Sequence, residues 1–305
     1  MLEKTVRVCV PGTSANCGPG FDTLGVACTV YNELELTLLE EERLEIAVTG
    51  EGASNIPGDA RNIVWRSIRT LLRRAHAEEQ YHGARIRMKN GIPLSRGLGS
   101  SAAAIVAGLK AANLILNNRF SRRELLQIAT DLEGHPDNVA PAIFGGFTIT
   151  VMHDGHPECF SFMPRLPLKL VVAVPSFPLS TRAARSVLPA EVPLKDAVFN
   201  VSRAALLVAA LSKGNIHFLQ HAFEDALHQP YRAKLIPGMY DVFQAAREAG
   251  ALGASMSGAG PCLIAFTLDK AEEIGAAMVQ AFQQHDVEAR ALLLGVDDRG
   301  VRIKK

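Results

Sequence analysis

A run of small residues leading into a helix is the first stretch of the sequence whose residue types and spacing could do chemistry. Residues 93–104 read Pro-Leu-Ser-Arg-Gly-Leu-Gly-Ser-Ser-Ala-Ala-Ala. Gly97 and Gly99 let a ligand approach the backbone, and Ser100 or Ser101 can cap the helix that follows. Free amides and the positive end of the helix dipole would then face an anion, most naturally a phosphate. An ordinary capped helix after a glycine turn fits the same residues, so both interpretations stay open.

Two well-known nucleotide-binding loops can be compared with this run. A P-loop needs a lysine after its last glycine, and no lysine follows Gly99. The dinucleotide pattern Gly-x-Gly-x-x-Ala is matched by Gly97, Gly99 and Ala102. However, residues 92–96 separate the pattern from the preceding strand, and the region near position 122, where an acidic residue is needed, reads Ser-Arg-Arg. A nicotinamide-dependent oxidoreductase is therefore the weaker alternative.

Two further stretches are dense in polar groups. Residues 11–22 are too rich in Gly, Pro, Asn and Ser for regular structure, and Asn16 and Asp22 are their main polar contributors. Residues 133–138 read Glu-Gly-His-Pro-Asp-Asn. The glutamate stands at the end of an expected helix, where the dipole disfavours an anion, and a cation such as Mg²⁺ would stabilise it. The Asp-Asn pair could cap the next helix instead.

Isolated arginines in the second half of the chain are candidates for binding an anionic group. Arg182 and Arg185 begin an element that starts near Ser180, and Arg232 belongs to an expected turn at 229–232. A guanidinium can hold a carboxylate with two parallel hydrogen bonds, although exposure to solvent explains such arginines equally well. A second glycine-rich loop, residues 253–262, enters a strand.

The elements that must position these groups alternate between strands and helices in both halves, which favours an α+β fold. Alternating or continuous apolar patterns predict the strands, and spacings of three and four predict the helices. We place a domain boundary at the proline-rich segment before residue 168, giving domains 1–167 and 168–305. The expected strands are 5–10, 34–39, 44–48, 84–89, 168–175, 262–266 and 289–294, and the expected helices are 62–72, 105–114, 121–132, 198–211, 239–249 and 270–283.

Composition narrows the class of protein. The 305 residues carry 32 Lys and Arg against 31 Asp and Glu, a net charge of +1 that gives no overall field to recruit nucleic acid or a membrane. The five cysteines are odd in number and scattered, which is typical of core residues in a reducing compartment. The N-terminus lacks the apolar core of a signal peptide, and no apolar run reaches the length of a membrane span. We therefore expect a cytoplasmic protein.

Taken together, three motifs resemble those of the GHMP kinases, a family of small-molecule kinases. They lie at residues 11–22, 93–104 and 255–261, in the order that the family shows. Four stretches, residues 14–22, 133–141, 180–189 and 229–232, are most similar to the members of the family that phosphorylate L-homoserine. The resemblance spans nearly the whole chain. One departure is that Gly134 alone separates Glu133 from His135, a spacing shorter than in many bacterial members.

The resemblance implies a fold and an activity. The fold would have an N-terminal domain like ribosomal protein S5 domain 2 and a ferredoxin-like C-terminal domain, with the active site between them. The activity would be Mg²⁺-assisted transfer of the γ-phosphoryl group of ATP to the hydroxyl of L-homoserine, giving O-phospho-L-homoserine for threonine biosynthesis. A homodimer would agree with the family, and neither nucleic acid nor a membrane would be a partner.

The resemblance also implies the residues of the site. Glu133 with Ser100 or Ser101 would hold the metal, and Asn16, Asp22, Glu133 and Asn138 would form the catalytic group. The nucleotide would contact Asn62, Pro93, Leu94, Ser95, Arg96, Gly97, Leu98, Gly99, Ser100, Ser101, Ala102 and Ala103. The amino acid would contact Asn16, Asp22, His135, Asp137, Asn138, Thr181, Arg185 and Arg232.

Simple chemistry agrees with this assignment. Homoserine is a zwitterion, so Arg185 and Arg232 suit its carboxylate, and Asp22 or Asp137 suits its ammonium group. Asn138 cannot accept a proton at neutral pH, so we name no general base, and Asp22 could orient the hydroxyl. Two alternatives stay open: a GHMP kinase for a mevalonate-type or shikimate-type alcohol, and a relative that binds a ligand without catalysis.

Overall fold

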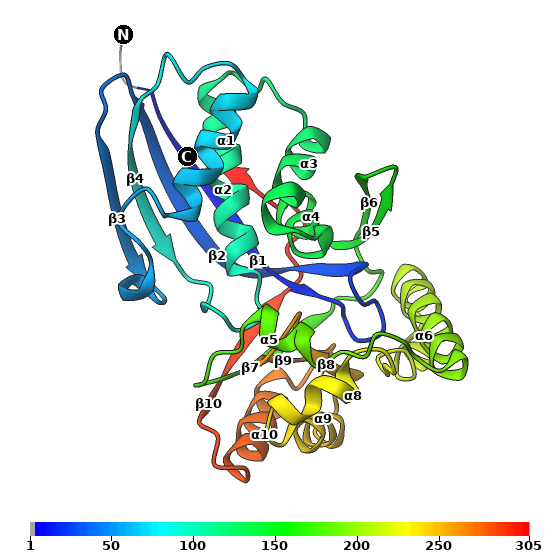
Figure 1. The fold of residues 1–305 in the computed structure, drawn as a ribbon. Coiled ribbons are helices and arrows are strands. Elements are labelled where there is room, and N and C mark those ends of the chain that lie inside the picture. The colour runs from blue at the N-terminus through cyan, green and yellow to red at the C-terminus, as the bar shows by residue number, and fades with distance from the viewer. Residues whose placement is uncertain (1–3, 305) are drawn as a thin grey trace.

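Two β-sheets organise the protein, and the computed structural model describes residues 4–304 (Figure 1). The first sheet has the order β11-β1-β2-β4-β3, with β5 pairing to β2 and β6 to β5. It contains β1 (Thr5–Ala15), β2 (Leu24–Leu39), β3 (Leu44–Gly50), β4 (Gly83–Asn90), β5 (Phe147–His153), β6 (His156–Phe162) and β11 (Arg302–Ile303). The second has the order β10-β7-β9-β8 and contains β7 (Lys169–Pro175), β8 (Gly253–Met256), β9 (Leu263–Thr267) and β10 (Ala289–Gly295).

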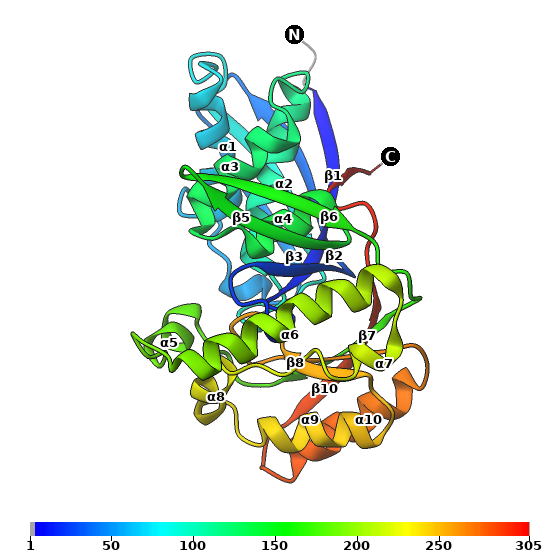
Figure 2. The same ribbon diagram turned by 90° about the vertical axis from the view of Figure 1, so that its right-hand side faces the viewer.

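Helices cover one face of each sheet, and this layering confirms the α+β expectation (Figures 1 and 2). The first sheet carries α1 (Ile63–Arg74), α2 (Ser100–Ile115), α3 (Arg122–Glu133) and α4 (Pro136–Phe144). The second half contains α5 (Thr181–Ser186), α6 (Leu194–Lys213), α7 (Ile216–Leu219), α8 (Gln229–Arg232), α9 (Met239–Glu248) and α10 (Ala271–Gln283). Short 3₁₀ helices lie at Ala53–Asn55 in the first half and at Ala233–Leu235 in the second.

Helix α2 is the centre of the first half. Almost every residue from Ala102 to Ile115 is buried, because the helix packs against β1 and β2 on one side and against α1 and α3 on the others. A helix that is apolar all round belongs in such a central position. Its N-terminus is thereby fixed at the junction between the two halves.

Local signals account for several helix ends. Asn62 caps α1 by accepting a hydrogen bond from the amide of Val64, and Ser121 and Glu124 form a capping box at the start of α3. By contrast, neither serine caps α2: Gly99 occupies its N-cap position with φ 65°. His135 is the N-cap residue of α4, so the Asp-Asn pair that follows it is not a cap either.

Three stretches expected to be irregular are regular. β1 continues from Val10 to Ala15 through a bulge at Pro11 and Gly12, and it pairs with a β2 that begins at Leu24 rather than Leu34. Residues 253–256 form β8, and the expected turn at 229–232 is the short helix α8. Composition favoured loops in these places, but pairing with other strands supplies the missing backbone hydrogen bonds of β1 and β8. At the start of α8, the amides of His228 and Gln229 donate instead to the carboxylate of Asp225.

The chain passes from the first sheet to the second between β6 and β7, near the boundary expected before residue 168. The C-terminal β11 then returns to the first sheet and pairs with β1. Helix α6 lies where the two halves meet (Figure 2), and Asn200 on it donates to the carbonyl of Pro19. The division into domains 1–167 and 168–305 stays a prediction.

Candidate active site

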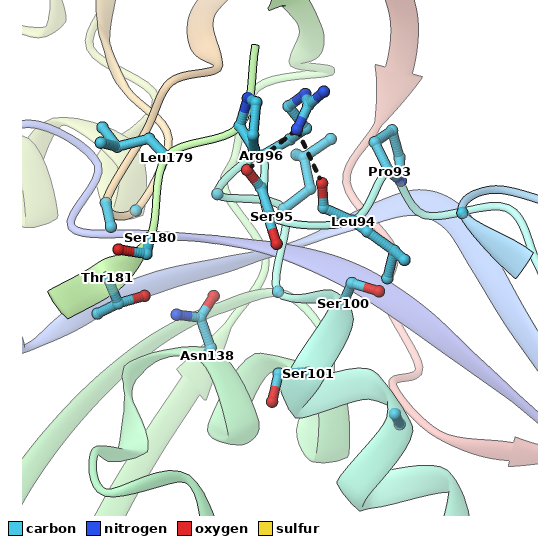
Figure 3. Close-up of a pocket in the computed structure, with 18 of the residues that line it drawn as sticks. Pro93, Leu94, Ser95, Arg96, Ser100, Ser101, Asn138, Leu179, Ser180 and Thr181 are labelled. Carbon is cyan, nitrogen blue, oxygen red and sulfur yellow. Dashed lines mark hydrogen bonds between the residues drawn. The ribbon is translucent and has the colours of Figure 1, made fainter. Parts of the chain in front are cut away.

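A cavity of about 1210 Å³ lies between the two halves and collects most of the expected site residues. Figure 3 shows Ser100 and Ser101 at the start of α2, with Asn138 and Thr181 beside them and the run Pro93 to Arg96 above. Ala102 and Ala103 are fully buried in the core and do not line the cavity, and their contact with a nucleotide stays a prediction. The expected residues that do line it are Asn16, Asp22, Asn62, residues 93–101, Glu133, His135, Asp137, Asn138, Thr181, Arg185 and Arg232.

The third glycine-rich motif holds the first two together. The hydroxyl of Ser257 donates to the carbonyl of Gly97 at 2.6 Å and lies 2.9 Å from the hydroxyl of Ser14. The amide of Gly258 donates to the carbonyl of Ala15 at 3.1 Å. Segments from three distant parts of the chain therefore form one wall of the cavity.

The loop before α2 accepts only glycine at two positions. Gly99 has φ +65°, and a Cβ there would lie 2.0 Å from Oγ1 of Thr13, whose hydroxyl donates to Oδ1 of Asn138. Gly97 has φ +79°, and its Cβ would lie 2.1 Å from the carbonyl oxygen of Ser257. At both positions the loop backbone lies directly against neighbouring segments and has a positive φ, a combination that glycine alone adopts without a clash.

The start of α2 leaves amides available to a ligand. The amide of Ala103 donates to the carbonyl of Gly99 at 2.9 Å and is not available, whereas the amides of the first helical residues have no carbonyl one turn earlier to bind. Arg96 is also engaged: it donates to the carbonyls of Pro175 and Ser176 at 3.0 and 2.6 Å. Arg96 thus ties the loop to the end of β7, and the helix N-terminus is the candidate site for an anion.

Glu133 lies close to that helix start. It is the last residue of α3, and its carboxylate accepts a hydrogen bond of 2.8 Å from the hydroxyl of Ser101. Burial raises the pKa of Glu133 above its ordinary value, and the Ser101 hydroxyl and His135 partly offset this. Burial deprives this carboxylate of the water that stabilises its charge, and a bound cation would stabilise the charged form instead.

His135 and Asp137 form a pair at the start of α4. Nδ1 of His135 contacts Oδ1 of Asp137, whose side chain is 3% exposed. This hydrogen bond raises the pKa of His135 above its ordinary value. The pair places a buried carboxylate and a half-buried imidazole beside Glu133.

At the other end of the cavity, the residue 16–22 loop meets the arginines of the second half. Asn16 accepts from the amide of Asp22 at 3.0 Å and donates to the carbonyl of Gly258 at 2.9 Å. Arg185 forms two hydrogen bonds with Asp22, at 2.9 and 3.0 Å. Arg232 is 2% exposed, and no carboxylate among residues 4–304 lies within ion-pair distance of it. The cavity therefore contains a buried cation on which Asp22, Asp225 and Asp137 act only from beyond contact distance, and a carboxylate of a ligand could pair with it directly.

Comparison with known proteins identifies the family. The GHMP kinases N terminal domain matches residues 62–146, and the GHMP kinases C terminal domain matches residues 207–284. The homoserine kinase of Moorella thermoacetica is 47% identical over 92% of this chain and 93% of its own, and that of Carboxydothermus hydrogenoformans is 44% identical over 97% and 95%. The chain is a GHMP kinase.

Within the GHMP kinases, the chain belongs to the homoserine kinases. The crystal structure of homoserine kinase from Cytophaga hutchinsonii superposes with a TM-score of 0.90 at 32% identity, covering 100% of this chain and 98% of that one. A mevalonate kinase from L. major has a TM-score of 0.74 at 16% identity over 95% and 96% of the two chains, which shows the common fold alone. Within residues 4–304 of this GHMP kinase, only β3 and β4 pair in parallel, so the described sheets are not the doubly wound parallel sheet that the oxidoreductase alternative requires.

Sequence reasoning missed one end of the cavity of this GHMP kinase. Oδ1 of Asn90 is buried there and has no hydrogen-bond partner, and Glu51 forms an ion pair with Arg290 across the two halves. The sequence of this region offers turn-forming residues, Gly52, Pro57 and Gly58, and these carry no chemistry of their own. The missed lining residues include Glu51, Asn55, Ile56, Pro57, Arg61, Met88, Asn90, Ser176, Leu179, Glu288 and Arg290.

Asn62 lies at the same end, but its carboxamide is already engaged. It is fully buried, donates to the carbonyl of Pro57 at 2.8 Å and accepts from Val64 at 2.9 Å. Its contact with a nucleotide stays a prediction. No helix among residues 4–304 is long and apolar enough to cross a membrane.

Proposed function

We propose that this protein transfers the γ-phosphoryl group of ATP to the hydroxyl of L-homoserine, giving O-phospho-L-homoserine for threonine biosynthesis. One observation carries the proposal: a helix N-terminus suited to phosphate and a buried, unpaired Arg232 suited to carboxylate open into the same cavity. The homoserine kinases that the chain resembles over nearly its whole length support it.

The phosphates of ATP would bind at the loop and the first turn of α2. Residues Gly97 to Ser101 line the cavity, and backbone amides with a helix dipole stabilise negative charge there. The base would lie toward Met88 and Asn90, where Asn62 and Pro57 form the wall. The chain would thus hold the phosphates mainly through its backbone.

The residues at the phosphate end fit a magnesium ion. Glu133 is a partly buried carboxylate that forms no ion pair with a lysine or arginine of the described chain, and Ser101 bonds to it. Carboxylate and hydroxyl oxygens are ligands that Mg²⁺ accepts, together with substrate phosphates. We assign Glu133 with Ser100 or Ser101 to the metal, which when bound would neutralise charge on the phosphates.

The amino acid would bind at the arginine end. Arg232 would hold its carboxylate, and Asp22 or Asp137 its ammonium group. Asn16 and Asn138 would orient the hydroxyl, with His135, Thr181 and Arg185 completing the pocket. Phosphoryl transfer depends on position and charge neutralisation more than on covalent chemistry, so the reaction needs no dedicated base.

A second candidate is phosphorylation of another small alcohol. Mevalonate and shikimate also carry a carboxylate that Arg232 could bind, but neither carries an ammonium group. The acidic side chains of Asp22 and Asp137 in the cavity favour the amino acid. A relative without catalysis is less favoured, because both serines and Glu133 meet at the phosphate end.

Coupled ADP release tests the proposal. Purified protein with Mg-ATP would be offered L-homoserine, mevalonate, galactose and shikimate separately. We expect turnover with L-homoserine alone. Turnover with another alcohol would retain the kinase and reject the substrate, and absence of ADP with all four would favour the binding protein.

We also propose that the protein acts in the cytoplasm, without nucleic acid or a membrane as partner. Its balanced charge agrees with this. A homodimer stays a prediction, which the molar mass in solution would test.

A further inference from the structure

His228 is a buried imidazole beneath the arginine end of the cavity, next to α8. It is fully buried, and so is the side chain of Asp225. The carboxylate of Asp225 accepts hydrogen bonds from the backbone amides of His228 and Gln229, at 3.0 and 2.7 Å. The backbone from which the imidazole projects is therefore fixed.

Both ring nitrogens of His228 have partners of known polarity. Nε2 lies 2.8 Å from the carbonyl oxygen of Gly18, which can only accept, so Nε2 carries the proton. Nδ1 lies 3.3 Å from Nη1 of Arg232, and a guanidinium only donates, so Nδ1 accepts. These partners assign a neutral imidazole in a single tautomer. Burial lowers the pKa of His228, which agrees with the neutral form.

The same contact orients Arg232. Its Nε donates to the carbonyl of Ala184 at 3.1 Å, and its Nη1 donates to Gly258 and to His228. Among the described residues, Nη2 has no hydrogen-bond acceptor, and Arg232 lines the cavity. Because the guanidinium is planar, fixing Nε and Nη1 also fixes where Nη2 points.

Phe21 joins this arrangement to the residue 16–22 loop. Its ring stacks on the imidazole of His228 with centroids 5.0 Å apart, and the guanidinium of Arg232 lies 5.3 Å from the centroid of Phe21. His228 therefore contacts the loop twice, through Gly18 and through Phe21, and contacts the arginine once.

We propose that His228 is a positioning residue for the amino-acid subsite: it holds the Arg232 guanidinium with Nη2 free for a substrate carboxylate and ties it to the Gly18 loop. The inference rests on the proposed function, which assigns the substrate carboxylate to Arg232. It predicts that His228 governs the KM for the amino acid and not the KM for ATP.

Three variants separate its two hydrogen bonds. In His228→Asn the side-chain amide can occupy the place of Nδ1 and keep the contact with Arg232. In His228→Gln the longer amide can reach the place of Nε2 and keep the contact with Gly18. His228→Leu removes both hydrogen bonds and replaces the imidazole with an apolar side chain of similar bulk.

The measurement is steady-state kinetics of each purified variant with L-homoserine and ATP varied in turn. We expect His228→Leu to raise the KM for homoserine roughly 10- to 100-fold, because a charged group loses its hydrogen-bonded orientation, and to change the KM for ATP less than about twofold. His228→Asn should recover most of the homoserine KM, and His228→Gln should recover less.

A matched control distinguishes positioning from a general loss of stability. Asn113 is also buried, bonds to Phe120 and does not line the cavity. Asn113→Leu should lower the thermal midpoint and leave both KM values unchanged. Equal rises of the two KM values in His228→Leu would overturn the role of His228. So would a His228→Asn variant that does not recover the KM for homoserine. If His228→Leu does not fold, the KM values of the Asn and Gln variants decide. A wild type inactive on homoserine would overturn the proposed function and the inference with it.

Discussion

Arg185 and Asp22 form a two-pronged ion pair that links the two halves of the protein across the arginine end of the cavity. The pairs Nη1 to Oδ2 and Nη2 to Oδ1 are 3.0 and 2.9 Å long, and the residues are 163 positions apart in the chain. Both side chains are more than a third exposed, so the pair contributes little stability by itself. It neutralises Arg185 and leaves Arg232 as the cation available to a substrate carboxylate.

Arg232→Met tests that distinction. We expect the KM for L-homoserine to rise roughly 100-fold, because the substrate carboxylate loses a charged hydrogen-bond donor, while the KM for ATP stays within about twofold. Steady-state kinetics with each substrate varied in turn would measure this. A similar rise in both KM values would remove Arg232 from the amino-acid site.

Arg185→Ala should also raise the KM for homoserine more than that for ATP, by a factor below that of Arg232→Met, because Arg185 already has Asp22 as partner. Arg182→Ala is the matched control, since Arg182 lies on the same short helix and is exposed. The control should leave both KM values unchanged. An equal effect of Arg185→Ala on the two substrates would contradict its placement.

Glu133→Gln should lower kcat by about 100-fold or more and leave the fold intact, because a neutral amide replaces the proposed metal ligand. In the wild type, the raised pKa of Glu133 means that its charge is lost at a higher pH than for an ordinary carboxyl group. Apparent Mg²⁺ affinity should therefore weaken as pH falls through that raised pKa. Titrations of activity with Mg²⁺ between about pH 5 and 8 would measure it, and a pH-independent affinity would count against Glu133 as the ligand.

His135 gives a prediction about stability. Its pKa is raised in the folded protein by Asp137, so the protonated form favours folding. This stabilisation is fully present below the ordinary histidine pKa and is lost as pH rises through the raised value. His135→Gln should lower the free energy of unfolding by about 1–2 kcal/mol below pH 6 and by less above pH 8. Urea unfolding at both pH values would show it, and an equal cost at both would contradict the charged pair.

Gly99→Ala should strongly impair ATP binding, because its Cβ would lie 2.0 Å from Oγ1 of Thr13 at φ +65°. Gly134→Ala is the control: Gly134 has φ +95°, but nothing lies within 4 Å of its Cβ. The control should carry only the backbone cost of about 1–2 kcal/mol. Comparable KM values for ATP in the two variants would argue against close packing as the reason for glycine.

Local patterns in the sequence determined much of the fold and many of the cavity residues. Helices α1 and α3 follow from their apolar spacing and their caps at Asn62 and Ser121, which involve residues only a few positions apart. The glycines at 97 and 99 mark a backbone that must turn sharply, and the comparisons confirm the family that the motifs indicated. The individual roles of the site residues stay predictions.

Only the tertiary structure decided which groups neutralise one another. Residue types alone made Arg185 and Arg232 equivalent, but Asp22 pairs with the first, and His228 and two carbonyls orient the second. The extension of β1 to Ala15 and the end of the cavity around Asn90 likewise depend on strands and turns far apart in the chain. Charge pairing and strand pairing are set by distances across the folded molecule, and a local pattern of residues does not contain those distances.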